Sequence, residues 1–152
     1  MLILILSLSV FVLDQITKYI VYTNMRYHQS IQVIGDFFMI TYTRNSGAAF
    51  SILSNVNSSF RTPFFLSISI VTISLIIIFY KRIAVKGKWY QISFGFILGG
   101  AFGNLLDRIR WGNIVDFFDF GIKNIRWPVF NIADSSICIG VGILFLLMMK
   151  DK

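Results

Sequence analysis

Four of the seven acidic residues lie close together in the sequence, between two long apolar runs. They are Asp107, Asp116, Asp119 and Asp134. Carboxylates beside a membrane span are costly unless they are paired, protonated or facing a wet cavity. Two aspartates held together in a low-dielectric site cannot both ionise, so one keeps a proton while the other acts as a base on water. Such a pair could hydrolyse a peptide bond. The alternative for any single aspartate is an ion pair with Lys18, Arg108 or Arg110.

Other chemistries have little support in the sequence. His28 is the only histidine and lies in a polar loop, so no Ser-His dyad is expected. Neither a G-x-G-x-x-G pattern after a strand nor a Walker loop is present. Cys138 is the only cysteine; it excludes an internal disulfide and is expected to be an apolar packing residue of the last span. One histidine and one cysteine disfavour a zinc site, and neither metal nor cofactor is expected.

The composition indicates an integral membrane protein. Hydrophobic residues make up 56% of the chain and charged residues 14%, with a mean hydropathy of +0.73. Four apolar runs have about the length of a membrane span, roughly 17–25 residues. They cover about residues 1–22, 63–80, 89–106 and 132–149. The first lacks a basic n-region and a cleavage site, so it is expected to be a retained span and not a signal peptide.

The net charge of +7 does not indicate nucleic-acid binding, because the basic residues mark the ends of spans. Lys81, Arg82, Lys86 and Lys88 crowd the link between the second and third spans, and Lys150 lies near the end of the chain. The positive-inside rule places these points in the cytoplasm. With four spans, both termini are expected to be cytoplasmic.

The direction of the spans predicts one polar site on one membrane face. Spans one and three run in the same direction and span four runs in the opposite one. The polar groups at the relevant span ends are Asp14, Gln15, Lys18, Asn104, Asp107, Arg108, Asn131, Asp134, Ser135 and Ser136. Asp14 and Lys18 are four residues apart on one helix face, as in a favourable ion pair. A direct role at the site and an interfacial pair with a snorkelling Lys18 both stay open.

Two further patterns predict structure around the site. Residues 31–53 are rich in β-branched and aromatic types, which favours a small sheet with a turn over residues 44–47. Phe37, Phe38 and Phe50 are expected to dip toward lipid. Small residues repeat every four positions in the third and fourth spans, which favours close helix packing. These are Gly95, Gly99 and Gly103, then Ser136 and Gly140.

The chain resembles the lipoprotein signal peptidases, or signal peptidase II, the bacterial aspartyl membrane proteases that process prolipoproteins. Five ordered motifs carry the resemblance: D-Q-I-T-K at 14–18, N-S-G-A-A-F at 45–50, G-N-L-L-D-R at 103–108, V-D-F at 115–117 and F-N-I-A-D-S at 130–135. The resemblance covers essentially the whole chain. It implies a single membrane domain over residues 1–152, an all-α bundle of four transmembrane helices with a small extracytoplasmic β-sheet, the β-cradle.

The resemblance also implies the roles of individual residues. The catalytic pair would be Asp116 and Asp134, with Asn131 orienting it, and Asp119 would be a loop residue. Other residues would bind substrate or support the site: Asp14, Lys18, Asn45, Gly47, Asn104, Asp107, Arg108 and Ala133. Asp107 and Arg108 would hold the loop, and a lid would lie within about residues 44–59.

The substrate implied is a prolipoprotein whose cysteine already carries diacylglycerol, cut just before that cysteine. The enzyme would be a monomer in the lipid of the bacterial cytoplasmic membrane, with its site near the extracytoplasmic face, and would be inhibited by globomycin-type peptides. The glycine repeat leaves packing between chains open. Two alternatives are a proton-coupled carrier that relays charge through Asp14, Asp107 and Asp134, and a structural assembly subunit. A relay should place ionisable groups along the bilayer depth, whereas these lie toward one face.

Overall fold

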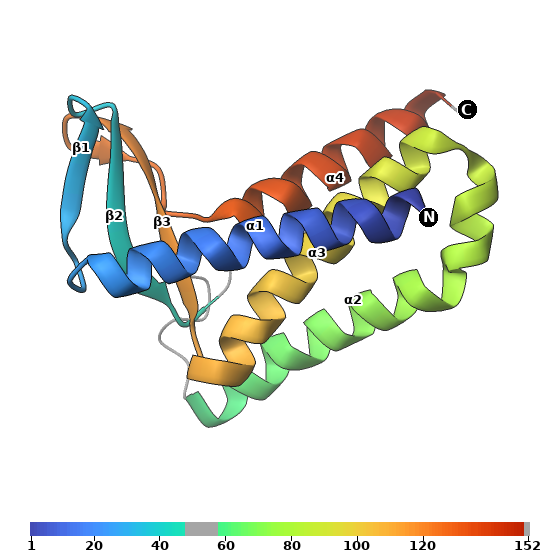
Figure 1. The fold of residues 1–152 in the computed structure, drawn as a ribbon, viewed down its shortest axis with the longest axis horizontal. Coiled ribbons are helices and arrows are strands. Elements are labelled where there is room, and N and C mark those ends of the chain that lie inside the picture. The colour runs from blue at the N-terminus through green and yellow to red at the C-terminus, as the bar shows by residue number, and fades with distance from the viewer. Residues whose placement is uncertain (48–57, 151–152) are drawn as a thin grey trace.

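Helix α3, Lys88–Trp111, is the central helix and packs against each of the other three. The others are α1 Leu2–Asn24, α2 Ser58–Lys86 and α4 Ile132–Lys150. The computed structural model describes residues 1–47 and 58–150. Figure 1 shows the helices forming an elongated bundle with a small sheet at one end and both chain termini at the other. The sheet end therefore holds the loops that follow α1 and α3 and precede α4.

The glycines of α3 allow its backbone to approach α1 closely. A Cβ on Gly99 would collide with Val10 and with the backbone oxygen of Ser7. A Cβ on Gly103 would collide with the carboxylate of Asp14. The close packing predicted from the small-residue repeat is therefore confirmed, and at Gly103 it also makes room for a buried acid.

Within the described residues, three helical segments are long and apolar enough to cross a membrane: Leu2–Asn24, Pro63–Lys86 and Ile132–Lys150. Their outer faces carry exposed apolar side chains, such as Ile78 and Leu146, which suit contact with lipid. Helix α3 covers the remaining predicted span. It is less apolar, because its last turns include Asn104, Asp107 and Arg108.

The sheet has four strands: β1 Ser30–Ile34, β2 Phe38–Asn45, β3 Ile114–Ile122 and β4 Ile125–Arg126. Their order is β1-β2-β3-β4, and all neighbours are antiparallel. The predicted sheet is present, but Arg44 and Asn45 belong to β2 and not to a turn. Residues 48–53 of the predicted sheet region, Phe50 among them, and most of the predicted lid lie outside the described residues.

The interpretation of Asp119 as a loop residue is wrong. Asp119 lies in β3 and is buried, and it forms an ion pair of 2.7 Å with Arg126 of β4. Its other carboxylate oxygen accepts a hydrogen bond of 2.6 Å from Thr41 of β2. Asp119 thus joins three strands through its side chain.

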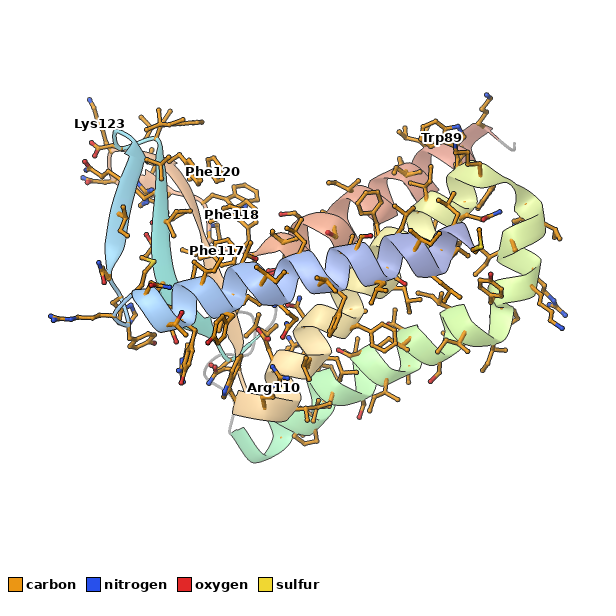
Figure 2. All side chains as sticks on the ribbon, in the orientation of Figure 1. Trp89, Arg110, Phe117, Phe118, Phe120 and Lys123 are labelled. Carbon is orange, nitrogen blue, oxygen red and sulfur yellow. The ribbon has the colours of Figure 1, made fainter. Side chains whose placement is uncertain are left out.

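Aromatic side chains cover one face of the sheet. Phe38 stacks on Phe120 with ring centroids 4.6 Å apart, and Phe118 contacts Phe130 at 5.6 Å. Figure 2 shows Phe118 and Phe120 on the strand that leads from the tip of the sheet toward the helices. Phe38 is therefore part of an aromatic cluster and does not simply face lipid, whereas Phe37 is exposed.

Candidate active site

The start of α4 is closed by a reciprocal cap between Asn131 and Asp134. The Asn131 side-chain oxygen accepts a hydrogen bond of 2.9 Å from the Asp134 backbone N–H. The Asp134 carboxylate in turn accepts one of 3.3 Å from the Asn131 backbone N–H. This is the geometry of a capping box, and it fixes both side chains at the first turn of the helix.

Asn131 also joins this helix start to β3. Its side-chain Nδ2 donates to Asp116 Oδ1 at 2.6 Å and to the backbone oxygen of Val115 at 3.2 Å. A single amide side chain therefore contacts Asp116 through its nitrogen and the Asp134 backbone through its oxygen. The two predicted catalytic aspartates come from different elements and are held on either side of one buried asparagine.

The surroundings of Asp116 favour its protonated form. Its side chain is only 1% exposed. Burial, together with the neighbouring charge of Asp134, raises the pKa of Asp116 from its ordinary value to about 8. Hydrogen bonds from Asn45 and Asn131 and the charge of Lys18 oppose the rise. At neutral pH the pair can therefore hold a proton on one carboxyl group beside an ionised partner.

Lys18 is the cation at the centre of the site. It lies 2.9 Å from Asp14 and 3.0 Å from Asp107, and it is 1% exposed. Its ammonium group also donates to Asn104 at 3.0 Å, and Asn104 donates to Asp134 at 2.8 Å. The snorkelling alternative for Lys18 is therefore wrong: its charge is balanced internally by two carboxylates.

These two carboxylates also position backbone segments. Asp14 accepts a hydrogen bond of 2.9 Å from the N–H of Ala133 in the first turn of α4. Asp107 accepts one of 3.1 Å from the N–H of Val115 in β3. Gln15, which the span directions place on this same face, donates to both acids at 3.2 and 3.1 Å. The resemblance gives Gln15 no role, although its place beside Asp14 in a strongly apolar helix already indicates one.

The end of β2 completes one side of the site. Asn45 hydrogen-bonds to Asp116 through its side chain, and its side-chain oxygen accepts the N–H of Gly47 at 2.9 Å. Arg108 donates to the backbone oxygen of Gly47 at 3.3 Å and lies 5.0 Å from the ring centre of Phe65. Each predicted site residue thus lies in the hydrogen-bonded network or contacts it.

A groove of about 270 Å³ leads to Asp134 from the side of α4. Its walls include Pro128, Val129 and Phe130, and Asn45 and Cys138 also line it. Cys138 is exposed, so its interpretation as a packing residue is wrong. Of the two predicted catalytic aspartates, Asp134 lines the groove.

Together these features define a class of protein: a membrane-type helical bundle that holds two close carboxyl groups at the junction with a small sheet, beside a groove open to one side. The family model described as signal peptidase (SPase) II matches residues 6–150. The chain therefore belongs to the signal peptidase II family. The family consists of aspartic proteases of the bacterial inner membrane that cleave lipoprotein signal peptides, and this chain is an aspartic endopeptidase of that type.

Individual relatives agree with this assignment. The lipoprotein signal peptidase of Geobacter metallireducens is 43% identical over 93% of this chain and 86% of its own length. That of Halothermothrix orenii is 43% identical over 97% of this chain and 95% of its own. A solved structure titled as a bacterial membrane enzyme, determined in meso at 2.3 Å, superposes with a TM-score of 0.88 at 37% identity, covering 98% of this chain and 88% of that one.

Proposed function

We propose that Asp116 and Asp134 are the catalytic pair of an endopeptidase that cuts diacylglyceryl-modified prolipoproteins just before the lipidated cysteine. The observation that carries the proposal is the shared contact of both residues with Asn131. It holds a carboxyl group of high pKa beside a second carboxyl group, whose ionised form is favoured by hydrogen bonds from Asn104 and from the Asn131 backbone.

In the proposed mechanism, the ionised carboxylate takes a proton from water while the water oxygen attacks the carbonyl carbon of the scissile amide. The protonated carboxyl group gives its proton to the carbonyl oxygen, so a neutral tetrahedral diol forms. The diol then returns a proton to the carboxylate that lost one, the other carboxyl group protonates the amide nitrogen, and the C–N bond breaks. No covalent intermediate with the enzyme forms, and the hydrogen bonds of Asn131 to Asp116 and to Asp134 hold the two residues in place.

The proposed topology brings the substrate to the pair from the bilayer. All four helices span the membrane, α3 included, both termini are cytoplasmic, and the carboxyl pair faces the extracytoplasmic side. The basic residues at the end opposite the sheet support this orientation. The apolar signal helix and the lipid would approach α4 laterally, through the groove beside Asp134, and globomycin-type peptides would compete for it. We expect the monomer to be the active form.

The test of the proposal is cleavage of a diacylglyceryl-modified prolipoprotein by the purified chain in detergent. The assay compares it with variants in which Asp116 or Asp134 is asparagine, and mass spectrometry of the product locates the cut. Turnover retained in either variant would overturn the catalytic assignment, and a cut elsewhere than before the lipidated cysteine would overturn the site of cleavage.

The groove makes Cys138 a test of the substrate path. Cys138→Trp is expected to lower kcat/KM for the lipidated substrate by about tenfold, mainly by raising KM, because the indole would occupy space beside Asp134. Cys138→Ala is the matched control and should leave cleavage unchanged. Equal kinetics of the tryptophan and alanine variants would place the substrate path elsewhere.

The pKa of Asp116 predicts a pH dependence. Cleavage should decline as pH rises through about 8, where the shared proton leaves. In the unfolded chain Asp116 loses its proton near 3.8, so the folded state binds more protons between about pH 4 and 8. The free energy of unfolding should therefore fall across that interval and level off above it. Asp116→Asn should flatten this slope in thermal unfolding between pH 4.5 and 9; an unchanged slope would contradict the assigned pKa.

A further inference from the structure

A second groove lies at the opposite end of the bundle from the carboxyl pair. It has a volume of about 540 Å³ and is walled by the end of α2, the start of α3 and the end of α4. Figure 1 shows these three helix ends at the same end of the molecule, away from the sheet. Figure 2 places Trp89 at this end and Lys123 at the tip of the sheet. The groove is therefore separate from the site described above.

The α2 wall of this groove is apolar along most of its length and basic at its end. Leu75, Phe79, Arg82 and Lys86 follow one another at intervals of four, three and four residues, which puts them on one face of the helix. At ~1.5 Å per residue, Leu75 lies about 10 Å along the helix from Arg82, the first of the two basic residues. This length fits within the ~15 Å hydrocarbon depth of one leaflet, half of the ~30 Å core, and places the basic end toward the membrane surface.

The groove opens sideways toward lipid. Leu75 and Phe79 on its edge are 49% and 41% exposed, whereas Ile76 and Ile83 on its floor are buried. Leu144 of α4 closes the other side. In a bilayer such an apolar trough must be filled by an acyl chain, because neither water nor a polar peptide backbone is stable at that depth.

The basic end carries charge that the described residues do not neutralise. Between residues 58 and 150, Arg82 and Lys86 form no ion pair; they lie over the rings of Phe79 and Tyr90, at 5.5 and 5.0 Å. In the described part of the chain, every acidic residue belongs to the site network or to the sheet and its hairpin. Asp151 lies outside the described residues. A ligand with a negative head group would complement this end.

We propose that the groove binds an anionic phospholipid of the surrounding leaflet, with one acyl chain along the apolar stripe and its phosphate at Arg82 and Lys86. Basic pockets between helix ends on the cytoplasmic side are suited to such head groups. The proposal rests on the proposed membrane topology, but not on the catalytic assignment of Asp116 and Asp134.

The first test is native mass spectrometry of the detergent-solubilised chain with phosphatidylglycerol or with phosphatidylcholine of the same acyl chains. Phosphatidylglycerol should be retained in preference to phosphatidylcholine. In the R82Q/K86Q variant, the ratio of the two retained lipids should be about tenfold lower. K81Q/K88Q removes the same charge from exposed residues of the same link that do not line the groove, and it should keep the preference. Equal retention of both lipids, or an equal loss in both variants, would overturn the proposal.

A second test separates a lipid from a free phosphate. Met148→Trp should obstruct the apolar wall and lower the retention of phosphatidylglycerol, while millimolar inorganic phosphate should not displace it. Thermal unfolding of each variant checks that the bundle is intact; Met148 is exposed, so the change leaves the core untouched. Full displacement by phosphate, with no effect of Met148→Trp in the folded chain, would indicate a surface anion site and contradict lipid binding.

Discussion

Replacing either Asp116 or Asp134 with asparagine is expected to lower kcat for prolipoprotein cleavage by about 10³-fold or more. Asparagine has nearly the same shape as aspartate but can neither take a proton from water nor hold one for the leaving amine. General acid-base groups contribute roughly 10²–10⁴-fold each, and both steps of the proposed mechanism use both residues. Initial rates with a lipidated prolipoprotein, followed by gel shift, measure the loss.

Because the two residues act as one unit, their effects should not add. The Asp116→Asn/Asp134→Asn double variant is expected to be no slower than the slower single variant. If the fold loss of kcat in the double variant equals the product of the two single losses, the aspartates contribute independently. That result would contradict a shared proton.

The controls must show that the loss of kcat comes from the missing carboxyl group and not from unfolding of the variant. Asp36 lies exposed in the β1–β2 hairpin, where its carboxylate accepts a 3.3 Å hydrogen bond from Gln32. Its backbone oxygen accepts one of 3.0 Å from Arg126, and a change of side chain keeps that bond. Asp36→Asn should therefore cleave at the normal rate. Asp116→Asn should remain folded at neutral pH, since removing a buried carboxyl group of high pKa removes a cost of ionisation. An unfolded Asp116→Asn variant would contradict that electrostatic account.

The helical part of the fold could be predicted because long apolar runs leave few alternatives in a membrane. The strands β3 and β4 could not, although Ile114–Ile122 is rich in β-branched and aromatic residues. Two aspartates interrupt that run, and they suggested a polar loop. These two carboxyl groups can be buried in a sheet because each has a partner from another segment, Asn131 for Asp116 and Arg126 for Asp119. The local sequence does not reveal these partners.

The directions of the spans were enough to predict that the site residues lie at one membrane face. They were not enough to predict which of these residues contact one another. Span counting places Lys18 and Asp107 on the same face, yet it cannot distinguish a snorkelling lysine from one buried between two acids. The second outcome requires the close α1–α3 approach that Gly103 permits. Similarly, Asn131 was identified near Asp134, whereas its reach to β3 depends on a strand that was not predicted.

Lys18→Met is expected to destabilise the folded chain by about 3–5 kcal/mol, the cost of breaking a buried ion pair by removing one partner. Methionine matches the lysine stem in length, so packing is largely kept while the charge is lost. Asp14 and Asp107 are each 0% exposed and would face one another without a cation. Thermal unfolding in detergent should show a large drop in midpoint, and cleavage should fall because Asn104 loses its donor beside Asp134.

A compensated variant separates lost charge balance from lost packing. Lys18→Met combined with Asp14→Asn and Asp107→Asn removes all three charges, so it should recover much of the unfolding midpoint that Lys18→Met loses. Lys81→Met, at an exposed position, is the matched control and should leave the midpoint unchanged. If the triple variant is no more stable than Lys18→Met, the network holds the fold through its shape and hydrogen bonds. If Lys18→Met itself unfolds like the unmodified chain, the two acids do not need this cation, and Lys18 cannot be the charge that balances the site.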